Sequence, residues 1–468
     1  MKIISKYINT IIINNRFIIL GFLLFLSSCD KEFVEVDLPN SLVSGELVFQ
    51  NDETAIAAAT GMYTKLLSNN SFIGQFNSIA YLGGFSSDEL IDYSNTAPNS
   101  EFYQNQLNAN NSSVLGIWSS AYNIIYEANA VIEGVTASTT LSPDVKTQLE
   151  GEGKFVRAFC YFYLVNLFGD VPLITSTNYQ TNSTLGRSDE EEVYNQIIND
   201  LTNARILLTE DYSGSSRVRP NKWAATALLS RIYLYNENYS MAELESTSLI
   251  NSSQYTLQSD INNVFLRDSN EAILQLVKVY PNGFPTPDGV IFYISSEGAT
   301  KDINSDLLNS FEVGDLRKDN WITTRDINSI IYYRPNKYKV RFYFTDSNYP
   351  EDLVLLRLAE QYLIRAEARI NQNDIVGAQE DINVIRNRAG LLNTTAASQP
   401  ELLLAVEQER RHELFSEMGH RWLDLKRTNR AATVLGPIKS DWNSEDVLYP
   451  IPESEILKNI NLTQNPGY

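Results

Sequence analysis

The sequence predicts a mainly α-helical fold of paired helices, interrupted by an irregular, loop-rich insert that carries a few short strands. Apolar residues recur at three- and four-residue spacing through residues 115–250 and 351–430, as they do on the buried face of a helix. Between these segments, residues 255–350 hold short β-branched and aromatic runs bounded by Asn, Gly, Pro and Asp, a pattern typical of strands and turns.

The predicted helices come in pairs joined by short polar breaks. Residues 355–366 and 378–389 share helical spacing and are separated by the polar run Asn-Gln-Asn-Asp. The same design repeats within residues 223–250, where small alanines stand at the expected helix crossings. A tyrosine after the break and an alanine three residues later, Tyr239 and Ala242, are similar to tetratricopeptide units.

Three runs within the insert predict strands: residues 272–277, 290–294 and 330–333. The insert is too aromatic to be disordered, because aromatic side chains supply the apolar surface that disordered segments lack. Long irregular segments inside folded proteins are commonly functional. We therefore expect the insert to contribute to a ligand site.

The N-terminal segment predicts a lipid anchor at Cys29. An apolar run from Phe17 to Leu26 follows basic residues, and small residues stand just before Cys29, as in a secretory signal. A run of about 10 residues is too short to span a bilayer, which takes roughly 20. The run Leu-Ser-Ser-Cys resembles a bacterial lipobox, in which acyl chains are attached to the cysteine. We expect residues 1–28 to be a lipoprotein signal peptide; the alternative is a buried structural cysteine after the signal.

Composition and charge argue against a nucleic-acid partner. The chain has 37 Lys and Arg against 57 Asp and Glu, a net charge of −20, and removal of three basic residues with the signal peptide brings this to −23. Such a field repels DNA, RNA and anionic membrane surfaces. Cys160 is the only cysteine besides Cys29, so no disulfide framework forms in the mature chain if Cys29 is lipidated.

The sequence contains no motif for catalysis or metal binding. His412 and His420 are its only histidines, and on one helix they would stand about 12 Å apart, too far to share an ion. Charged residues between 409 and 424 pair at spacings of three and four, which predicts a charged, solvated face of that helix. No two carboxylates stand out as a glycosidase pair, and no Gly-x-Ser-x-Gly elbow occurs. We predict no catalytic residue, metal or cofactor.

Eight motifs occur in order along the chain, on and between the predicted helices. The longest carries Arg157 and Tyr161 and ends in Phe-Gly-Asp-Val-Pro-Leu, and the last ends in Asn-Pro-Gly-Tyr. Their limits are 118–129, 157–173, 356–368, 383–390, 409–414, 421–427, 449–452 and 461–468.

Together these motifs resemble the SusD/RagB family of outer-membrane nutrient-binding lipoproteins of Bacteroidota. The resemblance implies a single SusD-like domain over residues 29–468, anchored to the outer membrane and facing the cell exterior. It also implies a non-catalytic protein that binds an oligosaccharide or polysaccharide and delivers it to a SusC-like TonB-dependent transporter. The acidic residues after Cys29 are similar to the surface-export signal of such lipoproteins. The alternatives are a RagB-like peptide-binding lipoprotein, a surface glycan-degrading enzyme and an adaptor that binds only proteins.

Aromatic residues in loops are the candidate ligand contacts. Sugars present flat C–H faces that stack on aromatic rings, while carboxylates and amides bond to their hydroxyl groups. The same aromatic side chains fill protein cores, so each residue has an alternative role in packing. The candidates lie in two regions of the chain: Tyr81, Asp88, Tyr93 and Tyr103 in the first, and Tyr280, Phe284, Tyr293 and Trp321 in the second.

Overall fold

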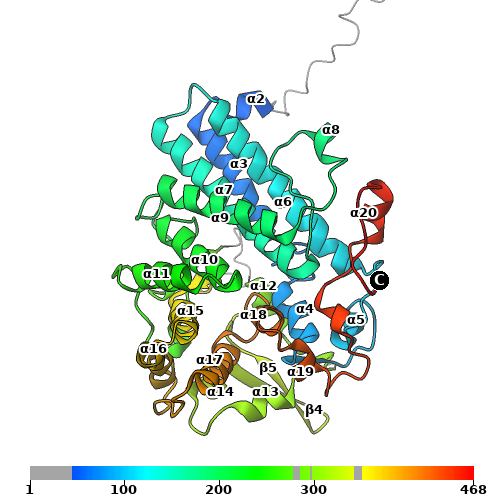
Figure 1. The fold of residues 1–468 in the computed structure, drawn as a ribbon, viewed down its shortest axis with the longest axis vertical. Helices are drawn as coiled ribbons and strands as arrows, with labels where there is room; N and C mark the ends of the chain where they lie inside the picture. Colours follow the sequence, from blue (N-terminus) through cyan, green and yellow to red (C-terminus); the bar gives the residue numbers. More distant parts are fainter. Residues whose placement is uncertain (1–44, 278–284, 296–297, 342–349) are drawn as a thin grey trace, which may run out of the picture. The chain divides into compact units, whose positions relative to one another are not determined.

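Helices make up about half of the chain that the structure describes, and the longer ones pack side by side (Figure 1). The structure is a computed structural model, and residues 49–468 form one unit within it, while the short helix α2 (Gly45–Val48) belongs to the N-terminal unit. None of the described helices combines the length and hydropathy needed to cross a bilayer. The described residues are 45–277, 285–295, 298–341 and 350–468.

Three of the predicted features fall outside the described residues. These are the signal peptide at residues 1–28 with the lipid-attachment residue Cys29, and the candidate ligand contacts Tyr280 and Phe284. They stay predictions.

The first half of the unit is built around helix α7 (Pro143–Phe168), which packs against α3 (Asp52–Leu66), α6 (Ser112–Ala137) and α9 (Glu190–Leu207). The apolar second half of α7 is buried on all sides, as its composition predicts. Shorter helices lie in the connections: α4 (Ile79–Ser86), α5 (Asn99–Gln104) and α8 (Tyr179–Asn182).

Both predicted helical pairs are confirmed. Helix α10 (Lys222–Tyr235) packs on α11 (Tyr239–Ile250), and α15 (Leu358–Asn371) packs on α16 (Ile375–Arg388). Helix α11 also packs on α15, so the two pairs stack on each other. The small residue Ala242, expected at a helix crossing, is fully buried.

The polar break has the same construction in both pairs. The chain passes through the left-handed region at Glu237 (φ 55°) in the first break and at Asn373 (φ 64°) in the second. The next residue then caps the following helix: the Asn238 side chain accepts from the N–H of Met241, and Asp374 does the same three residues along. The repeat recognised in the sequence is therefore a repeat of backbone geometry.

The described residues form three two-stranded antiparallel sheets and no larger sheet, and each of the three has at least one strand in the insert. The predicted strands at 272–277 and 330–333 are confirmed as β2 and β5. The pairs are β1 (Leu90–Asp92) with β3 (Lys301–Ile303), β2 (Ala272–Leu276) with β6 (Leu353–Arg357), and β4 (Ile322–Ile327) with β5 (Ile330–Pro335). Short helical segments join them: η2 (Ile261–Asn263), α12 (Pro287–Ile291), α13 (Ser305–Ser310) and α14 (Leu316–Trp321).

The prediction of a strand at 290–294 is wrong, because residues 287–291 form helix α12. Pro287 occupies the first turn, where its missing N–H costs nothing. The hydroxyl of Thr286 accepts from the N–H of Gly289 at 3.1 Å. These capping features outweigh the β-branched run that follows them.

The expected continuous helix at 409–424 is also wrong. Helix α17 (Gln399–Leu414) ends before Ser416, and α18 (His420–Arg427) begins after Gly419. Ser416 (φ 55°), Met418 (φ 46°) and Gly419 (φ 72°) lie in the left-handed region, which breaks the helix. The chain ends with α19 (Ala431–Leu435), η3 (Ser444–Val447) and α20 (Glu453–Lys458).

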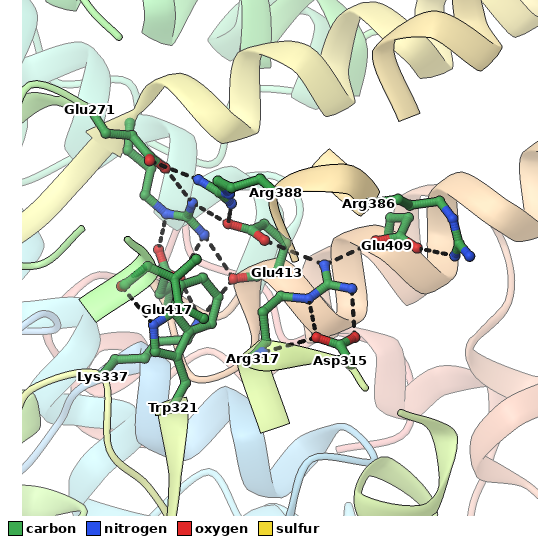
Figure 2. Close-up of polar contacts among 12 residues, drawn as sticks. Glu271, Asp315, Arg317, Trp321, Lys337, Arg386, Arg388, Glu409, Glu413 and Glu417 are labelled. Atoms are coloured by element: carbon green, nitrogen blue, oxygen red, sulfur yellow. Dashed lines mark hydrogen bonds and ion pairs between the residues drawn. The ribbon is translucent and has the colours of Figure 1, made fainter. Parts of the chain in front are cut away.

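The charged residues of this segment are buried, which corrects the prediction of a solvated face. Glu409, Glu413 and Glu417 are buried and pair with basic residues far away in the sequence. They do not form the expected pairs with residues three or four positions along the same segment, all of which the structure describes. Figure 2 shows Glu413 between Arg388 and Arg317. We name this set of side chains the ion network; its cations are Arg317, Lys337, Arg357, Arg386 and Arg388, and its carboxylates are Glu271, Asp315, Glu409, Glu413 and Glu417.

Arg357, the last residue of β6, makes the largest number of contacts in the ion network. Its Nε donates to Glu417 at 2.8 Å, and its Nη1 donates to Glu413 at 2.6 Å and to Glu271 at 3.1 Å. Its Nη2 reaches the backbone carbonyl of Glu413 at 2.7 Å. One guanidinium therefore joins β6, the segment before β2, and the end of α17.

We expect the substitution Arg357→Met to lower the free energy of unfolding by about 3 to 5 kcal/mol. Methionine keeps most of the volume but leaves buried carboxylates without their cation. The measurement is chemical denaturation of the purified mature protein. Lys458→Met is the matched control, because Lys458 pairs with Glu455 at the surface, where such pairs contribute less than about 1 kcal/mol. Equal stability of the two variants would contradict the role of the ion network.

A pH dependence follows from Glu413. Burial would raise the pKa of this carboxyl, but Arg388, Arg357 and Arg317 outweigh burial and hold the pKa well below its usual range. A depressed pKa in the folded state stabilises the protein above the unfolded pKa of about 4, and this stability is lost as pH falls. We expect Glu413→Gln to melt at a lower temperature than wild type at pH 7, with a difference that shrinks below about pH 4.5. A constant difference down to pH 3 would contradict this.

Candidate functional site

The β4–β5 hairpin presents one face of the candidate site. Its two-residue turn is Asn328-Ser329, with φ values of 54° and 64°, which suits the twist of the strands. Arg325 lies opposite Tyr332, and Thr323 lies opposite Arg334. Because side chains alternate along a strand, these four residues share one face of the hairpin.

Tyr93 and Tyr332 form an open aromatic surface, which we name the tyrosine platform. Tyr93 directly follows β1, and its N–H donates to the carbonyl of Thr300 at 2.9 Å, which extends the β1–β3 ladder. The two ring centroids are 5.9 Å apart at an interplanar angle of 75°. Tyr93 is 45% exposed, so its ring is accessible to a ligand. An exposed edge-to-face tyrosine pair suits stacking against the C–H face of a sugar.

Polar groups border the tyrosine platform. Asp302 on β3 accepts from the N–H of Tyr333 at 2.6 Å, and burial raises the pKa of its carboxyl to about 6. Tyr103 on α5 is half-buried, and burial, followed by the charge of Asp92, raises the pKa of its hydroxyl. The pKa of Tyr93 is also raised, by burial and then by the charge of Asp302. The aromatic ring of Tyr93 therefore lies near a carboxyl and a hydroxyl group that can form hydrogen bonds with a ligand.

Four basic side chains gather beside the platform, and we name Lys301, Arg325, Arg334 and Arg341 the basic cluster. The guanidinium carbons of Arg334 and Arg341 lie 5.5 and 5.8 Å from the ring centroid of Tyr293. None of the four makes an ion pair with a carboxylate of the described residues, and the Nε atoms of the three arginines are buried without a hydrogen-bond partner there. Burial, then the charge of Arg341, lowers the pKa of Arg334 to about 10.

A polar groove of about 930 Å³ lies between the segments around α4 and α6. Asparagine and serine side chains line most of it, and Phe76, which is 55% exposed, lies at its side. Tyr81 borders both the groove and the basic cluster: its hydroxyl accepts from Asn99 at 3.4 Å, and the Nζ of Lys301 lies 5.5 Å from its ring centroid. The groove offers amides and hydroxyls to a ligand, but only a small aromatic area.

Trp321 does not offer a ring to a ligand, which corrects its prediction as a stacking residue. It is 1% exposed, and its Nε1 donates to the carbonyl of Ile261 at 3.0 Å. Its ring packs edge-on against Phe265 and lies 4.7 Å from the Nζ of Lys337. Trp321 is thus part of the core beneath the hairpin, beside the ion network (Figure 2).

Asp88 is likewise a structural residue, not a ligand contact. It is buried, and the Nε and Nη2 atoms of Arg421 donate to its two oxygens at 2.7 and 3.0 Å. Burial would raise the pKa of Asp88, but Arg421 and Arg411 outweigh it and hold the pKa below its usual value. The ring of Tyr81 packs against Phe85 and Phe292, and the residue is buried, so little of it is open to the groove.

The structure brings three of the predicted residues toward one place. Tyr93 is an exposed member of the platform, Tyr103 is close enough for its hydroxyl to affect the pKa of Tyr93, and Tyr293 lies against the basic cluster. Sequence reasoning missed Tyr332 and the whole basic cluster. Alternation in the run Tyr332, Tyr333, Arg334 was the available signal, since it places an aromatic and a basic residue on one strand face.

The described residues hold no cluster of His, Cys, Asp and Glu that could bind a metal ion. His412 is buried, and its Nε2 lies 2.8 Å from the hydroxyl of Ser310. Burial, followed by the charge of Arg317, lowers its pKa to about 2, and burial lowers the pKa of His420 to about 4. Both histidines therefore stay neutral at physiological pH.

The paired helices and the insert define a helical-repeat fold, and comparison with known proteins identifies its family. A family model described as "Starch-binding associating with outer membrane" matches residues 62–234. The model of the SusD family matches residues 177–468, more than half of the sequence. The chain belongs to the SusD family.

Relatives and solved structures agree with this assignment. A SusD-like protein of Formosa agariphila is 27% identical over 97% of this chain and 99% of its own length. A second SusD-like protein of that organism is 30% identical, over 53% of this chain and about half (48%) of its own length. A SusD superfamily protein from Bacteroides vulgatus, 22% identical, matches 90% of this chain and all of its own with a TM-score of 0.78. A "Laminarin binding SusD-like protein", 25% identical, covers the same share with a TM-score of 0.74.

Proposed function

We propose that this protein is a non-catalytic lipoprotein, anchored through Cys29 on the outer face of the outer membrane, that binds a glycan and delivers it to a SusC-like TonB-dependent transporter. Membership of a family described as starch-binding and associated with the outer membrane supports the location and the ligand class. Similarity to a laminarin-binding SusD-like protein supports a glycan ligand. The lipobox-like sequence before Cys29 supports the anchor.

The observation that carries the glycan assignment is the tyrosine platform. Tyr93 is the accessible ring of the tyrosine platform, and the ring of Tyr332 contacts it edge-to-face. The carboxyl of Asp302 and the hydroxyl of Tyr103 stand close enough to Tyr93 to affect its pKa. A sugar ring stacked on the platform would have these hydrogen-bonding groups near it with the protein in its present conformation.

Glycan hydrolysis is a second candidate function, which a single observation favours. Burial raises the pKa of Asp302 to about 6, the range in which a glycosidase general acid works. One oxygen of Asp302 is already occupied by the N–H of Tyr333, which suits a structural role better. The test is incubation of the purified protein with oligosaccharides. If the wild-type protein hydrolyses them and Asp302→Asn does not, hydrolysis replaces binding as the function.

We expect Tyr93→Ala to weaken glycan binding by about 1 to 3 kcal/mol, because removal of a central aromatic contact costs this much at many interfaces. The measurement is isothermal titration calorimetry on the purified mature protein, with laminarin oligosaccharides as the first ligand. Two aromatic variants serve as controls: Tyr179→Ala removes an exposed ring on α8, and Phe76→Ala removes the ring at the polar groove. Loss of affinity in Phe76→Ala, with normal binding by Tyr93→Ala, would place the glycan in the groove.

We expect Cys29→Ala to release the protein from membranes, since the variant lacks the acyl chains that anchor it. Cell fractionation followed by immunoblotting measures this, with Cys160→Ala as the control for loss of a thiol. The wild-type protein, isolated from detergent-solubilised outer membranes, should bring a TonB-dependent barrel with it. Unchanged membrane retention would contradict the anchor, and recovery of the protein alone would contradict the transporter partner.

A further inference from the structure

The basic cluster gathers four cations that have no ion-pair partners among the described residues. Elsewhere in the described residues, buried arginines are matched by carboxylates: the ion network contains five cations and five carboxylates. Arg231 with Glu360 and Arg157 with Asp200 follow the same rule. Arg334 is also buried, yet no described carboxylate lies within ion-pair distance of it.

The charges around the basic cluster do not cancel. Asp92 faces Lys301 from β1, but its Oδ1 accepts from Ser94 and its Oδ2 has no partner among the described residues. Asp302 bonds to the backbone N–H of Tyr333. Glu351, whose charge acts on Arg341, accepts from the N–H groups of Lys339 and Val340. Three carboxylates therefore stand near four cations, and none of the three makes an ion pair with a cluster cation, in a protein whose overall net charge is −20. Gathering cations in this way costs free energy unless an anion is bound among them.

The position of the cluster connects it with the glycan surface. Arg325 is the cross-strand neighbour of Tyr332, so its side chain rises from the hairpin beside the tyrosine platform. Arg334 lies two residues along the same strand and the same face. Arg325 and Arg341 are partly exposed, and Arg334 is buried, with its guanidinium over the ring of Tyr293. A ligand on the platform thus has cations within reach.

We infer that the basic cluster binds the anionic group of an acidic glycan, either a uronate carboxylate or a sulfate ester, whose sugar ring stacks on the tyrosine platform. Guanidinium groups bind both anions through paired N–H donors. The inference rests on the proposed function, since it names the ligand class of the same surface. The anionic group of the glycan would give Arg325, Arg334, Arg341 and Lys301 the partner that an internal carboxylate gives to buried arginines elsewhere in the described chain.

The test compares glycans that differ only in charge. The full mature protein is titrated with galacturonan oligosaccharides and with their methyl esters, and separately with dextran sulfate and with dextran. We expect the charged member of at least one pair to bind ten times more tightly or better, and more weakly at high salt, since salt screens partly exposed charges. A difference in the first pair alone identifies a carboxylate; a difference in the second alone identifies a sulfate.

Two variants connect that difference with the cluster. Arg325→Gln and Arg341→Gln remove one charge each from partly exposed positions, and we expect each to reduce affinity for the charged glycan at least fivefold while melting temperature is kept. Lys458→Gln is the matched control, on α20, which lies away from β4 and β5 in Figure 1. If both arginine variants bind the charged glycan with the affinity of the wild-type protein, the inference is overturned.

The outcomes separate this inference from the proposed function. Binding of laminarin or dextran as tightly as of every charged glycan, with loss in Tyr93→Ala, would overturn the acidic ligand and leave glycan binding intact. Absence of binding to neutral and charged glycans alike would overturn both.

Discussion

The buried guanidinium of Arg357 is the interaction on which the arrangement of the insert depends. Its five donor contacts reach Glu271, Glu413 and Glu417, which come from two segments more than a hundred residues apart. Taking so many charges out of water is costly, and the cost is offset only when each charge finds its partner at hydrogen-bond distance. The ion network meets this condition only in one mutual placement of the strands and α17. It therefore specifies how the insert is attached, beyond what apolar packing alone would fix.

The ion network also holds the hairpin that carries the candidate site. Arg317 lies in α14, just before β4, and Lys337 lies two residues after β5. Both ends of the hairpin are thus tied to Glu409, Glu413 and Glu417, and the core around Trp321 fills the space beneath. A site built on such a supported element keeps its side chains in one geometry before a ligand arrives. The buried charges thus support the hairpin on which the exposed residues of the candidate site lie.

Sequence alone predicted those features that depend on local spacing. The helical pairs follow from three- and four-residue spacing and from caps such as Asn238 and Asp374, all within a few residues of one another. The charged run at 409–424 was misplaced because glutamates and arginines at helical spacing look alike whether they pair locally or with Arg317 and Arg357. Trp321 and Tyr93 are equally aromatic, and only tertiary packing buries the first and exposes the second. The members of the basic cluster are scattered between residues 301 and 341; pairing of β4 with β5 brings Arg325 and Arg334 together, and β3, which carries Lys301, packs against β5.

The protein is strongly acidic overall, yet its described part contains a basic cluster without ion-pair partners there. This combination would affect where an acidic glycan can bind. At physiological ionic strength, charges act over about 8 Å, so the acidic surface repels a polyanion wherever the two come close. The basic cluster places four cations at one position, beside an aromatic platform that on the proposed function would bind sugar rings whatever their charge. Binding would then be confined to one place and one register, because every other approach is penalised by like charge. On this argument the net charge of −20 and the four cations contribute to the same property, since the first suppresses non-specific contact and the second fixes where contact is made.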